Sequence, residues 1–270
     1  MYTPVRQPRL AGFMATGSKM AAFIALAVFV TELDLLSNSK MLYLLVGVSV
    51  LSMIYGNVVA ARQQNVKRML AYSSVAHAGY VLLGLCAGDQ GFMPVVFYMF
   101  IYTLMNIGAF GMVSMVEREF PDTNLDSWRG LGQKAPAFAV ALSVFMLSLA
   151  GIPPLAGFMA KYLVFAAAIN AGMIVPAIIG ILASVVGAYY YLRLIATMFF
   201  SGEDVESKLQ LRYGLAPAIG AAVLVALVIM YGVFPGMPGG CAVGGKFCIF
   251  MVETRFIASR NGQALGAETR

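Results

Sequence analysis

Long apolar runs recur along the chain, and short polar connections separate them. A membrane-crossing helix needs about 20 mostly apolar residues, because the hydrocarbon core of a bilayer is about 30 Å thick. The pattern predicts an all-α, polytopic transmembrane helix bundle of about seven spans. The predicted spans are residues 10–30, 41–61, 69–85, 92–116, 136–170, 173–200 and 215–234.

The run at residues 136–170 is too long for one straight crossing. As a continuous helix it would rise about 50 Å, at about 1.5 Å per residue. Pro153 and Pro154 have no N–H group, and Gly151 and Gly157 allow the backbone to leave helical geometry. We therefore predict a discontinuous helix in this range, broken at Pro153-Pro154.

Lys161 follows this predicted break. Unpaired carbonyl groups and an ammonium group cannot face lipid, so other helices or a hydrated cavity must enclose them. Interrupted helices beside a charge are a recurrent feature of ion-translocating proteins. The alternative is a proline kink with a lysine side chain that extends to the membrane surface.

Composition supports a membrane protein, because 60% of the residues are hydrophobic and 11% are charged, against about 25% charged in soluble domains. The net charge is +6, but the basic residues are dispersed and form no patch for nucleic acid. They gather in alternate connections instead, which predicts a cytoplasmic N-terminus and an external C-terminus. The residues on the predicted cytoplasmic side are Arg6, Arg9, Arg62, Lys67, Arg68, Arg118, Arg129, Lys134, Lys208 and Arg212.

Lys19 lies near the middle of the first predicted span, between small residues. A charge at that depth costs about 3 kcal/mol on insertion scales, and a side chain at the centre has far to reach to the surface. A functional role for Lys19 is therefore favoured over simple extension to the membrane surface.

The third predicted span contains His77, which is the only histidine, and Ser73 four residues earlier on the same helix face. Two interpretations are equally open: His77 is a hydrogen-bonded packing residue, or it extends a proton path. Lys67 lies in the basic turn before this span. It is either a topology anchor or part of a proton entry route.

Other polar residues within the spans are interpreted as structural. Asn57 directly follows Gly56, and Asn106 lies two residues before Gly108. A glycine near an amide is typical of close helix packing with an interhelical hydrogen bond. The sixth span contains three consecutive tyrosines and Arg193, whose side chain is expected to reach the cytoplasmic surface.

The chain divides into a membrane domain at residues 1–235 and a poorly ordered tail at residues 236–270, whose apolar run is too short to span. The three cysteines have no metal-ligand spacing of the C-x-x-C kind. A pair between Cys241 and Cys248 is conceivable, although free thiols are favoured for both and for Cys86.

No nucleotide-binding glycine loop, haem site or iron–sulfur motif is present in the sequence. No aspartate or glutamate lies within a predicted span, so carboxylates for sodium or calcium are missing there too. Lysines remain, and a lysine taken out of water gives up its proton more readily. This suits proton relay, for which moving one proton against 100 mV costs about 2.3 kcal/mol. Nothing in the sequence supplies that energy.

Three stretches carry a specific resemblance. They are G-S-K-M-A-A-F at residues 17–23, N-V-K-R-M-L-A-Y-S-S-V-A-H-A-G-Y at 65–80 and L-A-G-I-P-P-L-A-G-F-M-A-K at 149–161. They closely resemble subunit N of the bacterial proton-pumping NADH:quinone oxidoreductase, respiratory complex I, an antiporter-like membrane subunit. The resemblance runs from about residue 11 to about residue 235, and the lysine at position 161 distinguishes it from the related subunit M, where a glutamate is expected.

The resemblance implies a fold of about fourteen helices with two inverted repeats of about five helices each. This chain would begin just before the eighth helix and carry the whole second repeat, without the glutamate and lysine of earlier helices. Lys19 and Lys161 then correspond to proton-carrying lysines, with His77 as an intermediate and Lys67 as a further candidate. Ser73, Pro153, Pro154, Gly151 and Gly157 would support this relay.

The resemblance also implies that this chain binds no cofactor, and that NADH, flavin, iron–sulfur clusters and quinone bind to partner subunits. The partners would be other membrane subunits of complex I and the lipid of a bacterial plasma (inner) membrane. A subunit of a multisubunit sodium/proton antiporter is the alternative. A third reading is a structural remnant without transport activity.

Overall fold

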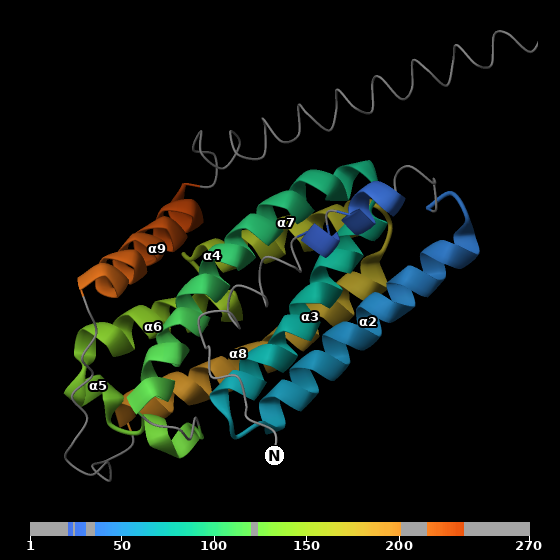
Figure 1. Ribbon diagram of the computed structural model, residues 1–270. Coiled ribbons are helices and arrows are strands. Elements are labelled where there is room, and N and C mark those ends of the chain that lie inside the picture. The colour runs from blue at the N-terminus through green and yellow to red at the C-terminus, as the bar shows by residue number, and fades with distance from the viewer. Residues whose placement is uncertain (1–20, 24, 31–35, 120–123, 201–214, 235–270) are drawn as a thin grey trace, which may run out of the picture.

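The computed structural model describes residues 21–23, 25–30, 36–119, 124–200 and 215–234, and these are mostly helical (Figure 1). The predicted tail at 236–270, with Cys241 and Cys248, lies outside the described residues. Within them there is one isolated β-bridge, between Asn65 and Asn124. A short helical piece at 21–30 precedes these elements: α2 Ser39–Arg62, α3 Val66–Cys86, α4 Asp89–Glu119, the 3₁₀ turn η1 Leu125–Trp128, α5 Leu131–Lys134, α6 Pro136–Ala150, α7 Ala156–Asn170, α8 Ile174–Phe200 and α9 Leu215–Val233.

The described helices agree closely with the predicted apolar runs. Four of them, α2, α3, α4 and α8, are long and apolar enough to cross a membrane, and the other apolar helices are shorter. The shorter ones include α6 and α7, which together occupy the range predicted for the interrupted span. The all-α, multi-pass fold is therefore confirmed, whereas the number of about seven crossings stays a prediction.

Helices α2 and α9 lie at opposite edges of the bundle, with the other long helices between them (Figure 1). α2 packs mainly along α3, and glycines bring the two backbones together. A Cβ atom added at Gly56 would lie 2.5 Å from the backbone nitrogen of Ala76, and one at Gly79 would lie 2.7 Å from Cγ of Met53. The close packing predicted at Gly56 is thus confirmed.

The connections at one end of the bundle hold each other in place. The side chain of Asn65 accepts a hydrogen bond from the Arg68 backbone and so caps the start of α3. The backbone N–H of Leu125 donates to the Gln64 carbonyl at 2.7 Å, which ties the η1 turn to the α2–α3 connection. Trp128 of η1 is fully buried. The segment after α4 is therefore packed onto the bundle at this end.

Helix α6 ends at Ala150, and α7 begins at Ala156. Gly151 adopts a left-handed conformation with φ of 85°, and its N–H donates to the carbonyls of Leu147 and Ser148. That conformation strongly favours glycine, because a Cβ atom there is strained. Pro153 and Pro154 lie in the connection between the two helices, where neither interrupts a helix from within.

Candidate functional site

Lys161 lies in the second turn of α7 and is only 7% exposed. Its ammonium nitrogen lies 3.0 Å from the Leu149 carbonyl, 2.9 Å from the Ala150 carbonyl and 2.8 Å from the Ser184 hydroxyl. It also lies 5.4 Å from the centre of the Tyr80 ring. The two carbonyls are the last of α6, where the helix dipole presents partial negative charge. The Lys161 ammonium thus completes hydrogen bonds that the end of α6 leaves unmade.

The connection between α6 and α7 is held closely around this lysine. The Gly157 N–H donates to the Ser148 hydroxyl at 3.1 Å, and a Cβ atom at Gly157 would overlap the Ser148 carbonyl oxygen. A Cβ atom at Gly151 would come within 2.9 Å of Cδ of Lys161. Because these two glycines have no side chain, α7 can pack close to the end of α6 and the Lys161 side chain can reach the α6 carbonyls.

Ser184 of α8 is the only side-chain oxygen recorded against the Lys161 ammonium in the part of the chain that the structure describes. A hydrogen bond to a charged group contributes about 1.5–3 kcal/mol. If the chain is part of a proton-pumping membrane complex, as its sequence resemblance implies, Ser184→Ala should slow proton pumping without preventing assembly. The matched control is Ser143→Ala, which removes a buried hydroxyl bonded only to the Ala139 carbonyl of its own helix. Equal pumping rates in the two variants would argue against a role for Ser184.

His77 of α3 is 3% exposed and lies among tyrosines. Its Nδ1 atom lies 2.6 Å from the Tyr98 hydroxyl, and its Nε2 atom lies 3.4 Å from the Tyr191 hydroxyl. The Tyr102 ring packs at 4.9 Å from the imidazole, centre to centre. One ring nitrogen of a neutral histidine donates and the other accepts, so His77 can take a proton on one side and release it on the other.

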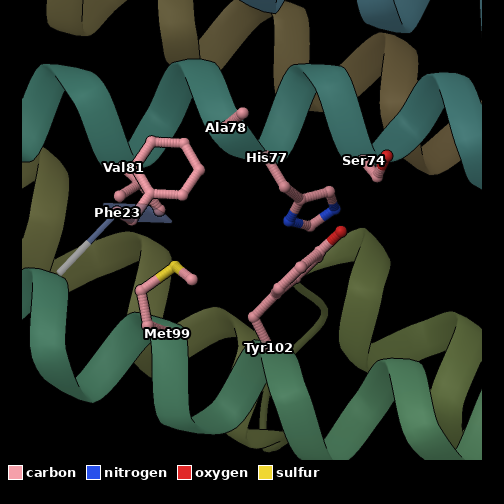
Figure 2. Close-up of a pocket in the computed structure, with 7 residues that line it drawn as sticks. All are labelled: Phe23, Ser74, His77, Ala78, Val81, Met99 and Tyr102. Atoms are coloured by element: carbon pink, nitrogen blue, oxygen red, sulfur yellow. The ribbon is translucent and has the colours of Figure 1, made fainter. Parts of the chain in front are cut away.

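A small cavity adjoins His77 (Figure 2). Its volume of about 10 Å³ is close to the space that one water molecule needs. Figure 2 shows His77 and Ser74 of α3 facing Tyr102 of α4 across it, with Met99 and Val81 at the apolar end. Phe23 closes that end. The lining is mostly apolar, which does not favour a bound water molecule.

The other predicted relay residues lie at different places. The Ser73 hydroxyl donates to the Leu70 carbonyl and interacts with Tyr191, the same tyrosine that contacts His77. Lys67 lies ten residues before His77 on α3, about 15 Å along the helix at about 1.5 Å per residue. It pairs with both carboxylate oxygens of Glu117 at 3.0 Å and is partly exposed. Lys19 lies outside the described residues.

Polar residues outside the predicted relay lie between Lys161 and His77. Tyr80 interacts with Ser184 on one side and accepts a hydrogen bond from Asn57 on the other. Asn57 in turn accepts from Tyr190. The interhelical hydrogen bond predicted for Asn57 is thus confirmed, but its partners belong to the site. The available signal was the tyrosine run in α8, where Ser184 and Tyr191 are seven residues apart and share a helix face.

These features define a class of protein: a multi-pass helical membrane protein with a lysine of one apolar helix, α7, buried against the end of the preceding helix, α6. The model of the NADH:quinone oxidoreductase/Mrp antiporter transmembrane family matches residues 9–187, a range that contains Lys19, His77 and Lys161. The chain belongs to this family.

Its relatives include proteins named NADH-quinone oxidoreductase subunit N. Subunit N 1 of Chloroherpeton thalassium is 41% identical over 83% of this chain and 47% of its own length. Subunit N of Salinibacter ruber is 43% identical over 84% of this chain and 47% of its own length. The predicted resemblance to subunit N is confirmed, and the chain spans about half the length of the curated relatives it matches.

Solved structures show the same fold. A chain in the respiratory complex I structure from Thermus thermophilus with bound aureothin superposes with a TM-score of 0.72 at 36% identity, covering 86% of this chain and 50% of that one. A chain of the Mrp complex from Dietzia sp. superposes with a TM-score of 0.74 at 23% identity, covering 89% of this chain and 51% of that one. The second similarity concerns the fold alone.

Proposed function

We propose that this chain is part of a proton-translocating membrane subunit of NADH:quinone oxidoreductase, respiratory complex I. The observation that carries the proposal is the Lys161 ammonium, which is buried and held by two carbonyls and a hydroxyl. No acidic side chain of the described ranges forms a salt bridge with it. When Lys161 releases its proton, the neutral amine leaves no unpaired negative charge beside it. Lys161 can therefore alternate between its charged and neutral forms.

Several finer features belong to the same proposal. α6 and α7 form one interrupted crossing of about seven, broken at Pro153-Pro154, within the second inverted repeat of the family fold. Lys161 and Lys19 carry protons, with His77 as an intermediate of the relay. Lys67 is a further relay candidate, and its partly exposed ion pair with Glu117 is also what a membrane-surface anchor would form.

The chain itself performs no redox chemistry under this proposal. NADH, flavin, iron–sulfur clusters and quinone bind to partner subunits, and their reaction provides the energy for proton movement. The complex lies in a bacterial plasma (inner) membrane, with the N-terminus of this chain cytoplasmic and its C-terminus external. The support is the similarity to subunit N and the gathering of basic residues in alternate connections.

The alternative function is a subunit of a multisubunit sodium/proton antiporter, favoured by the fold shared with the Mrp complex chain. We expect the purified chain to show no NADH:quinone reductase activity, because its energy source lies in other subunits. In liposomes, an imposed sodium gradient is expected to leave the internal pH unchanged, measured against protein-free liposomes. Redox activity of the chain alone contradicts the proposal, and sodium-driven proton movement supports the antiporter instead.

A further inference from the structure

Tyr98 of α4 is 1% exposed, and its hydroxyl oxygen lies 2.6 Å from Nδ1 of His77. Within the described part of the chain, Nδ1 is the only hydrogen-bonding partner recorded for the Tyr98 hydroxyl. The two side chains face each other because α3 packs against α4. Tyr191 of α8 lies on the opposite side of the imidazole, near Nε2.

The hydrogen of the Tyr98 hydroxyl needs an acceptor, because the group is buried away from water. Nδ1 of His77 can accept it only if this nitrogen carries no hydrogen of its own. A neutral imidazole carries its hydrogen on one of its two nitrogens, which must then be Nε2. In the opposite tautomer Nδ1–H would donate to the Tyr98 oxygen, and no acceptor for the Tyr98 hydrogen is recorded among the described residues.

The side of the ring that faces α8 agrees with the same tautomer. The Tyr191 hydroxyl lies 3.4 Å from Nε2 and interacts with the hydroxyls of Ser73 and Tyr190. Each of those two hydroxyls donates its hydrogen to a carbonyl oxygen elsewhere, so each can accept the hydrogen of Tyr191. The Tyr191 oxygen can therefore accept from an Nε2–H group of His77. Both sides of the imidazole thus favour a hydrogen on Nε2.

We propose that Tyr98 is a positioning residue that holds neutral His77 in its Nε2–H tautomer. The consequence for proton transfer rests on the proposed function. In this tautomer only Nδ1 can bind a further proton, so His77 accepts a proton from the side of α4. The hydrogen on Nε2 then leaves toward Tyr191 of α8. The ring that remains carries its hydrogen on Nδ1 and must regain the Nε2–H form before the next proton arrives.

The tautomer is measured by nuclear magnetic resonance of the full chain with ¹⁵N-labelled histidine, purified without a histidine tag. His77 is the only histidine, so the imidazole signals come from one residue. At a pH where these signals show a neutral ring, we expect at least about tenfold more Nε2–H than Nδ1–H form, since a buried hydroxyl without an acceptor corresponds to a factor of that size. A ratio equal to that of a histidine peptide in water would overturn the proposal.

Tyr98→Phe removes the hydroxyl and keeps the ring, which stacks on Tyr102 at 6.4 Å between centres. We expect the tautomer ratio to fall toward that of the peptide. Tyr102→Phe is the matched control: its ring packs on the same imidazole at 4.9 Å, but its hydroxyl interacts with Asn106 and Ser74. An unchanged ratio in Tyr98→Phe, or an equal fall in both variants, would overturn the proposal. If Tyr98→Phe does not fold, the ratio in the unmodified chain decides.

Pumping by the assembled complex tests what the tautomer contributes. The NADH-driven pumping rate of Tyr98→Phe should fall in proportion to the lost fraction of the Nε2–H form. A shifted tautomer with normal pumping would refute the role of Tyr98 in the relay. Lys161→Ala is measured beside it, because normal pumping by that variant contradicts the proposed function itself. The tautomer ratio of the full chain does not depend on that second result, so the two failures can be told apart.

Discussion

Replacing Lys161 with alanine is expected to abolish most of the proton pumping attributed to this subunit and to depress the coupled quinone reduction. The variant removes the ammonium that lies against Leu149, Ala150 and Ser184. No other ionisable side chain in the described part of the chain is recorded in contact with those two carbonyls. The measurement is the rate of acidification of inverted vesicles on addition of NADH, with assembly followed by the amount of intact complex.

Lys161→Arg is expected to be as damaging as Lys161→Ala. A guanidinium keeps a positive charge near the α6 carbonyls, but it stays protonated and cannot cycle. This variant separates charge from proton exchange, since a purely electrostatic role would be preserved by arginine. Pumping by Lys161→Arg at the unmodified rate would show that the lysine acts as a fixed charge.

The control for both variants is Lys40→Ala, which removes an exposed lysine from the first turn of α2. It should pump normally, because a surface charge contributes little to stability or to the buried site. An assembled Lys161→Ala complex that pumps as well as Lys40→Ala would exclude Lys161 from the proton route.

The second large effect is expected from Gly157→Ala. Alanine normally stabilises a helix relative to glycine by about 1 kcal/mol, but here its Cβ atom would overlap the Ser148 carbonyl oxygen. The α6–α7 connection must move apart, and overpacking of this kind costs about 1–3 kcal/mol. Because Lys161 lies one turn further along α7, its contacts with α6 should be lost as well. Reduced assembly and reduced pumping per assembled complex are the expected results.

Gly111→Ala is the matched control for Gly157→Ala. Gly111 is also helical, is exposed, and has no atom within 4 Å of the position that a Cβ would take. Thermal unfolding of the purified complex should show an unchanged or slightly higher midpoint for Gly111→Ala and a lower one for Gly157→Ala. Equal midpoints would mean that the α6–α7 connection tolerates the added atom.

The sequence predicted the positions of the helices well, because the length and hydrophobicity of each apolar run determine where a membrane helix forms. The run at residues 69–85 corresponds to α3, and the run at 173–200 corresponds to α8. The observed end of α6 at Ala150 lies near the predicted break, because Gly151 can adopt a left-handed conformation and the prolines lack an N–H group, whereas Gly157, predicted to help the backbone leave the helix, lies within α7. These properties depend on neighbouring residues only, so a linear pattern contains them. That α6 and α7 form one interrupted crossing stays a prediction.

The surroundings of Lys161 could not be predicted in the same way. Ser184 and Tyr80 reach it from α8 and α3, and neither is near it in sequence. The sequence alone indicates a packing residue at Asn57, because an amide beside a glycine in a membrane helix usually is one. Its packing role is real, but only the three-dimensional arrangement shows that its two hydrogen-bonded tyrosines lead toward Lys161 and His77. Long-range contacts of this kind leave no periodic signal.

The proposed relay depends on Lys161 changing its protonation state during turnover. Nuclear magnetic resonance of the assembled complex, with ¹⁵N in the lysine side chains and Lys161→Ala to assign the signal, observes that state directly. The proposal predicts an ammonium signal at rest and a neutral amine signal that appears when NADH is being oxidised. An ammonium signal that persists unchanged through turnover would contradict it.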